Sequence, residues 1–140
     1  MNVQRASNEY LAAEVEGSDP LHRIVMLHDR AACLIREAVR HIEGRDFERA
    51  HEAFTKAKNI VMHFLANIPE TDDGELAANL RGLFKYTYRK LAEGNLRKDP
   101  ASAEDALAVV RKLGEGWAAL DRARLSASQA NPPSGGAYLV

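Results

Sequence analysis

Glu48 and His51 are the residues whose types and spacing come nearest to a metal site. Helical bundles that hold a di-iron centre use two Glu-x-x-His motifs and a further Glu from each of the other two helices, all facing inward. The sequence contains a single copy of the motif, from Glu48 to His51, and Glu48 falls on the outer side of the apolar positions around it. We therefore interpret both as surface residues and expect no metal site.

The remaining residues that carry chemistry form no catalytic arrangement. His22, His28, His41 and His63 show no ligand spacing, and Cys33 lies on an apolar helical segment, where we expect a small core residue and not a reactive thiol. A glycine-rich phosphate loop, a nucleophile elbow and a paired-carboxylate site are all missing from the sequence. We expect a protein that is not an enzyme, with no catalytic residues and no cofactor.

A stretch of aromatic and basic residues, LRGLFKYTYRKL at positions 80–91, raises the question of nucleic-acid binding. On a strand, Phe84, Tyr86 and Tyr88 would line one face and stack on bases. On a helix, Tyr86 and Tyr88 lie roughly 160° apart and cannot stack bases side by side. Helical apolar spacing and the lack of flanking strands favour the helix, so we expect no nucleic-acid partner.

Helical periodicity covers most of the chain in four segments. They span about residues 20–44, 46–68, 72–98 and 99–127. Because the connections between these long helices are short, neighbours must run antiparallel. The sequence thus predicts an all-α fold, an antiparallel up-down four-helix bundle in residues 18–130. A short N-terminal arm, residues 1–17, precedes it, and a flexible tail rich in Pro and Gly, residues 131–140, follows.

Capping residues mark the expected helix ends. Asp19 and Asp99 are each followed by proline, a combination typical of a helix start. Asp72 and Glu75 stand at capping-box spacing and predict the start of the third helix, while Pro69 ends the second.

Apolar residues spaced by three and four predict the inward side of each helix. On the third helix they are Leu76, Leu80, Leu83, Thr87 and Leu91, with Phe84 beside them, and on the fourth Ala103, Ala106, Val110, Leu113, Trp117 and Leu120. The second helix follows the same rule with Phe47, Ala50, Phe54, Ala57, Val61, Phe64 and Ile68.

Composition places the chain among soluble globular proteins of one domain. It has 140 residues, 46% hydrophobic and 28% charged, and its 19 basic and 20 acidic residues leave a net charge of -1. This balance argues against general attraction to nucleic acid. The single cysteine, the lack of a secretory signal and the lack of a long apolar run predict a cytoplasmic protein with no membrane insertion.

Charge is nevertheless uneven along the chain. Between positions 81 and 98 there are six basic residues and one acidic residue, Glu93. This run is either a solvated helix face or a docking surface for a partner with acidic residues. A second ambiguous segment precedes the first helix, where Tyr10 and Leu11 belong to an amphipathic fragment that is either frayed or packed on the bundle.

The order of several short motifs resembles the FliS family of flagellar secretion chaperones. They are Tyr10, Pro20, Met26-Leu27-His28-Asp29, Lys56-Ala57-Lys58-Asn59-Ile60-Val61, the run from Gly74 to Leu80, Leu83-Phe84-Lys85-Tyr86, Asn95, Asp99-Pro100 and Trp117. The sequence departs from the family pattern at Arg23, His28, Arg30, Lys85 and Thr87.

The resemblance implies a cytoplasmic chaperone that binds the C-terminal region of flagellin and prevents its polymerisation before export, with the flagellar export apparatus as a further partner. It also implies that the N-terminal arm covers part of the binding surface until flagellin replaces it. The expected partner-binding residues are Tyr10, Leu11, Met62, Leu65, Tyr86, Tyr88 and Arg89. The alternative is a regulatory or structural helical bundle with a different helical partner.

Overall fold

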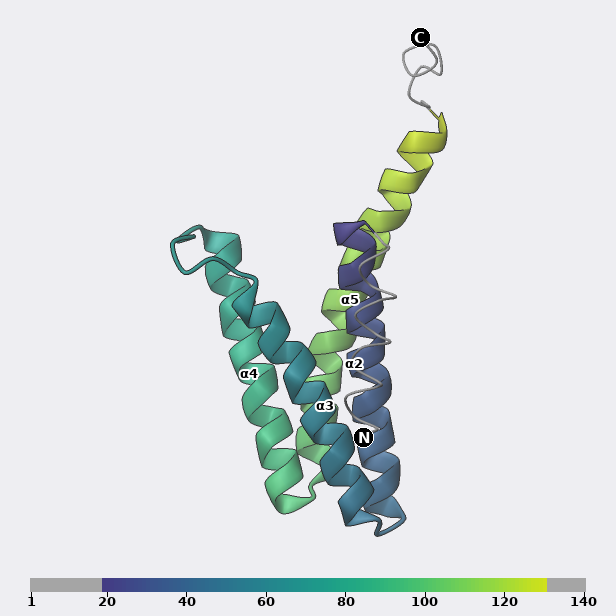
Figure 1. Cartoon of the computed structure of the whole chain (residues 1–140), viewed down its shortest axis with the longest axis vertical. Helices are drawn as coiled ribbons and strands as arrows, with labels where there is room; N and C mark the ends of the chain where they lie inside the picture. Colours follow the sequence, from purple (N-terminus) through teal and green to yellow (C-terminus); the bar gives the residue numbers. More distant parts are fainter. Residues whose placement is uncertain (1–18, 131–140) are drawn as a thin grey trace, which may run out of the picture. The chain divides into compact units, whose positions relative to one another are not determined.

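The computed structural model describes residues 19–130, and every regular element in this range is an α-helix. The helices are α2 (Pro20–Glu43), α3 (Phe47–Ala66), α4 (Glu75–Arg97) and α5 (Pro100–Ala130) (Figure 1). Across residues 19–130, no helix combines the length and the apolar composition that crossing a bilayer requires. The predicted arm, residues 1–17, and tail, residues 131–140, lie outside the described residues.

Aspartates cap the two helices that start with proline, as the sequence predicted. Asp19 Oδ1 accepts hydrogen bonds from the backbone N–H groups of Leu21 at 3.0 Å and His22 at 3.2 Å. Asp99 Oδ1 accepts one from Ala101 N–H at 3.0 Å. These carboxylates satisfy amides that the first turn leaves without a helical acceptor.

The starts of α3 and α4 differ from each other. Asp46 caps α3 by accepting from the N–H of Arg49 at 3.2 Å. The predicted capping box on α4 is wrong, because the N-cap is Gly74, which has no side chain to cap with. Asp72 instead accepts from the N–H of Gly74 at 3.0 Å, which makes it part of the turn before the helix.

Two compact units divide the described residues. One comprises residues 27–113, and the other comprises residues 19–26 and 114–130. The first unit contains parts of all four helices, joined by short connections, and its consecutive helices run antiparallel (Figure 1). The predicted up-down four-helix bundle is therefore confirmed.

Apolar side chains from all four helices form the core of the unit of residues 27–113. They include Ala31, Leu34, Ile35, Ala38, Ala50, Phe54, Ala57, Val61, Phe84, Leu91, Ala103, Ala106 and Val110. Gly94 allows a close approach in this core, since a Cβ atom there would lie 3.1 Å from the ring of Phe54 and 3.4 Å from the backbone nitrogen of Ala103. At this point α4 packs directly against α3 and α5.

The inward side of α4 differs from the one predicted. Leu76 and Leu83 were expected inside, but they are 68% and 38% exposed, while Ala77 and Phe84 are 7% and 4% exposed. Thr87 and Leu91, also expected inside, are fully buried, so the prediction fails only at Leu76 and Leu83, and the core side is rotated toward Ala77 and Phe84. The shift follows from Phe84, whose ring stacks on that of Phe64 with centroids 5.2 Å apart. Two other residues expected inside, Phe47 and Leu120, are also exposed.

Candidate partner-binding surfaces

Side-chain contacts fix how α3 and α4 lie against each other. The Nδ1 atom of His51 is 2.9 Å from Nδ2 of Asn95, and Nζ of Lys58 is 5.8 Å from the ring centroid of Tyr88. Between these two pairs the chain advances seven positions on α3 and goes back seven on α4, which is an antiparallel register. The same register places Leu65 beside the N-terminal half of α4.

In this register, apolar and basic side chains of α3 and α4 lie beside one another on the outer side of the two helices. We call it the α3/α4 surface and define it by Lys58, Met62, Leu65, Lys85, Tyr88 and Arg89. Met62 is 48% exposed, Lys85 and Arg89 are exposed, and Leu65 and Tyr88 are half-buried. Four of the residues predicted from the sequence therefore lie on one surface. Tyr10 and Leu11 lie outside the described residues.

Tyr86 lies on a different side of α4. Lys90 Nζ is 5.8 Å from the Tyr86 ring centroid and 3.6 Å from a carboxylate oxygen of Asp105 on α5. Lys90 also pairs with Glu93 at 3.5 Å, and the charge of Glu93 is the main reason why the pKa of Lys90 is raised. Tyr86 and Tyr88 are thus held by cations on opposite sides of the helix, and only Tyr88 lies on the α3/α4 surface.

The side of α4 that carries Tyr86 also carries apolar residues that sequence reasoning had placed in the core. Leu76 and Leu83 are seven positions apart, close to two helical turns, and so point the same way. Tyr86 follows Leu83 by three positions and extends this row. We call Leu76, Leu83 and Tyr86 the α4 stripe. The sequence signal that could have revealed it is the competing pair of Ala77 and Phe84, which are seven positions apart and continue to Leu91, a residue already predicted inside.

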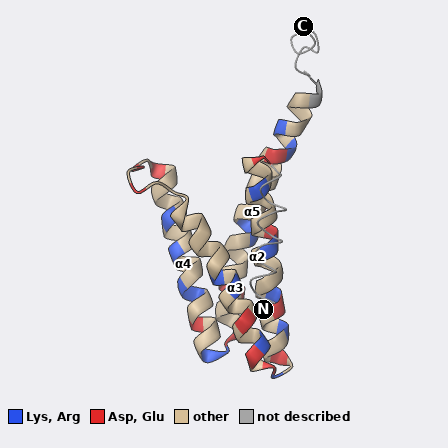
Figure 2. Cartoon of the chain, viewed as in Figure 1, with Lys and Arg blue, Asp and Glu red and all other residues tan. Residues whose placement is uncertain are grey.

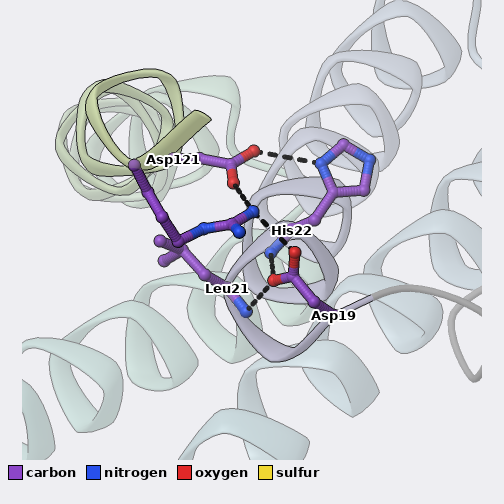
Figure 3. Close-up of polar contacts among 5 residues, drawn as sticks. Asp19, Leu21, His22 and Asp121 are labelled. Atoms are coloured by element: carbon purple, nitrogen blue, oxygen red, sulfur yellow. Dashed lines mark hydrogen bonds and ion pairs between the residues drawn. The ribbon is translucent and has the colours of Figure 1, made fainter. Parts of the chain in front are cut away.

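A charged cluster occupies the unit of residues 19–26 and 114–130 (Figure 3). Asp121, whose side chain is 8% exposed, accepts hydrogen bonds from His22 at 3.1 Å and Arg124 at 2.9 Å. Arg124 also pairs with Asp19 at 2.5 Å. The hydrogen bond with His22, and next the one with Arg124, lowers the pKa of Asp121 below its ordinary value. Sequence reasoning missed this cluster because it placed Leu120 inside.

Three residues considered for metal or thiol chemistry, Glu48, His51 and Cys33, lie on the surface. Glu48 and His51 are exposed, as expected. Cys33 is also exposed, with its Sγ atom 3.8 Å from Glu37 Oε1, so the expectation of a core cysteine is wrong. Cys33 misses the core because the buried side of α2 passes through its neighbours Ala32 and Leu34. Within the described part of the chain, no three His, Cys, Asp or Glu side chains lie close enough to hold a metal ion.

Comparison with known proteins places the chain in one family. The model of the family described as flagellar protein FliS matches residues 2–124. The chain is 33% identical over 104 residues to the flagellar secretion chaperone FliS of Salmonella typhimurium, covering 74% of this chain and 77% of that protein. It is 27% identical over 117 residues to that of Bacillus subtilis, covering 84% of this chain and 86% of the relative. The chain belongs to the FliS family of flagellar secretion chaperones.

Proposed function

We propose that this chain is a cytoplasmic export chaperone that binds the C-terminal region of flagellin. Binding prevents flagellin from polymerising early and keeps it competent for flagellar type III secretion, and the flagellar export apparatus is the partner that receives the complex. The relatives are flagellar secretion chaperones, which supports this class of function. The surface of α4 supports a helical or extended peptide as the ligand.

The observation that carries the proposal is the α4 stripe. Leu76 and Leu83 are 68% and 38% exposed, although the neighbouring Phe84 and Leu91 are 4% and 0% exposed in a closed core. Large apolar side chains that recur at seven-residue spacing on one side of a helix are the usual anchors for an amphipathic partner. Burying such a leucine beneath a bound partner contributes up to about 2 kcal/mol to the free energy of binding. A bound flagellin segment would supply this cover.

Calorimetry with the C-terminal segment of the cognate flagellin tests the proposal. We expect binding to the wild-type chain, and we expect the pair of substitutions Leu76→Ala and Leu83→Ala to weaken it by roughly tenfold or more. Leu120→Ala with Leu125→Ala is the matched control, because these two leucines are 55% and 45% exposed but belong to the other compact unit. This control should leave the affinity unchanged.

Two results would contradict the proposal. If the wild-type chain shows no binding up to about 100 μM peptide, the ligand is not flagellin, and the alternative of a bundle with a different helical partner takes its place. If the control pair at Leu120 and Leu125 weakens binding as much as the pair at Leu76 and Leu83, the peptide adheres to exposed leucines in general, and the α4 stripe is not the site.

A further inference from the structure

Three cations on the α3/α4 surface have no acidic partner in the part of the chain that the structure describes. Among the described residues, Lys58, Lys85 and Arg89 form no ion pair with any aspartate or glutamate. Lys90, on the other side of the same helix, pairs with both Glu93 and Asp105. Lys90 is thus neutralised by acidic neighbours, whereas Lys85 and Arg89 on the other side have none among the described residues.

This positive charge is local and does not follow from the composition. The whole chain carries a net charge of -1. Figure 2 shows Lys and Arg recurring along α4, whereas the acidic residues before it gather around its start. Arg81, the first cation of the run, is already engaged, since it donates to the backbone carbonyls of Pro69 and Asp72. Lys58, Lys85 and Arg89 thus bring three cations together where α3 and α4 meet on the outside.

Lys98 lies at the end of the basic run of residues 81–98 and adds to the positive charge near Lys58. It is half-buried at the C-terminus of α4, where its Nζ donates to Asn95 Oδ1 at 2.6 Å. Burial lowers the pKa of Lys98, and the positive charge of Lys58 lowers it further. The positive charges of Lys58 and Lys98 thus repel each other, and an anion bound beside Lys58 would weaken this repulsion.

Apolar groups between the cations narrow down the kind of ligand. Met62 is 48% exposed beside the half-buried Leu65 and Tyr88, so the surface offers hydrophobic contact as well as charge. A nucleic acid needs a row of cations that follows its phosphates, together with a basic domain. A short peptide with acidic and apolar side chains matches this mixture better.

We infer that the α3/α4 surface receives an acidic, amphipathic stretch of the flagellin C-terminal segment, with its carboxylates facing Lys58, Lys85 and Arg89 and its apolar side chains on Met62. The inference rests on the proposed function and adds a second, electrostatic contact to the apolar one at the α4 stripe. The two contacts lie on different sides of α4, so the segment must pass around this helix. Binding should then depend on salt, because Lys85 and Arg89 are exposed to solvent.

The test compares two charge reversals of equal size. The variant Lys85→Glu with Arg89→Glu reverses two exposed cations one turn apart on the α3/α4 surface. The control, Arg36→Glu with Arg40→Glu, makes the same change at the same spacing on the exposed side of α2. We expect the first variant to weaken binding of the flagellin C-terminal segment by roughly tenfold or more at low salt, and the control by less than about twofold.

A second test changes the peptide and leaves the protein unaltered, so that misfolding of a charge-reversed variant cannot explain the result. The same flagellin segment with its Asp and Glu residues replaced by Asn and Gln should bind the wild-type chain about tenfold more weakly at low salt. It should also lose most of the difference in affinity between low and high salt that the natural segment shows.

The outcomes separate the two proposals. If the natural segment does not bind at all, the proposed function fails and the inference with it. If it binds, but neither the amide-substituted segment nor the Lys85/Arg89 variant changes the affinity, only the inference is overturned. It is likewise overturned if these substitutions abolish binding to single-stranded RNA or to anionic phosphatidylserine vesicles while binding of the flagellin segment stays intact.

Discussion

The imidazole of His28 lies stacked on the ring of Phe64, with centroids 4.3 Å apart and an interplanar angle of 21°. Phe64 stacks in turn on Phe84 at 5.2 Å and 29°. One residue from each of α2, α3 and α4 thus contributes a ring to a single column. His28 is 2% exposed, so this polar residue serves as a core residue of the bundle. The column also sets the rotation of α4, since Phe84 must face inward to complete it.

Replacing His28 by Ala should lower the free energy of unfolding by about 2 to 3 kcal/mol, because it opens a cavity beside Phe64 and removes a stacked ring. Urea denaturation measures this loss. Arg36→Ala, an exposed substitution on the same helix, should stay within about 0.5 kcal/mol of the wild type. A similarly small effect of His28→Ala would mean that the column does not hold the helices together.

Two glycines of α4 form a matched pair. Replacing Gly82 by Ala should stabilise the protein by up to about 1 kcal/mol, because a Cβ atom there meets nothing within 4 Å and alanine favours the helix. Gly94→Ala should instead destabilise it by about 1 kcal/mol or more, because its Cβ would lie 3.1 Å from the ring of the fully buried Phe54. Thermal melting of both variants tests this. If both substitutions stabilise the protein equally, the ring of Phe54 moves to make room for the added Cβ atom.

The sequence predicted the helices well because their ends depend on local chemistry. The carboxylates of Asp19, Asp46 and Asp99 bond amides two or three positions ahead, and such contacts can be inferred from neighbouring residues. The sequence did not predict the rotation of α4. Leu76 and Leu83 compete there with Ala77 and Phe84 for the core, and only the rings on α2 and α3 decide between the two rows.

For the candidate surfaces too, the sequence predicted individual residues but not how the helices bring them together. Met62, Leu65, Tyr88 and Arg89 were predicted as separate candidates, and only the register between α3 and α4 shows that they share one surface with Lys58. The burial of Asp121 could not be predicted either, because it depends on His22 and Arg124 as partners, and His22 is 99 positions away. Contacts between distant segments are invisible to patterns within one helix.

Asp121 should make stability depend on pH in the acid range. Its pKa in the folded protein lies below the ordinary value of 3.8, so folding favours the ionised form. The resulting stabilisation is complete above that ordinary value and is lost as the pH falls from 3.8 through the lower folded pKa. Asp121→Asn should therefore lower stability near neutral pH and flatten the decline of stability as the pH falls below 3.8.

Urea unfolding followed by the fluorescence of Trp117 suits this test, because Trp117 lies one turn from Asp121 in the same unit and is the sole tryptophan of the chain. Glu104→Gln, on the exposed side of α5, is the control and should keep the wild-type pH dependence. If the free energy of unfolding of Asp121→Asn falls with decreasing pH as steeply as that of the wild type, other carboxylates dominate acid unfolding.

Deleting residues 1–17 tests whether the N-terminal arm competes with flagellin, as the family resemblance implies. An arm that occupies part of the binding surface lowers the apparent affinity by the fraction of molecules in which that surface is free. If the arm covers the surface nine-tenths of the time, deletion should strengthen binding of the flagellin segment by about tenfold in calorimetry. Replacing Tyr10 and Leu11 by Ser in the full-length chain should also strengthen binding of the flagellin segment. These substitutions keep the charges and the length of the arm but remove its apolar contacts. Unchanged affinity in both variants would mean a frayed end, and weaker binding would make the arm part of the site.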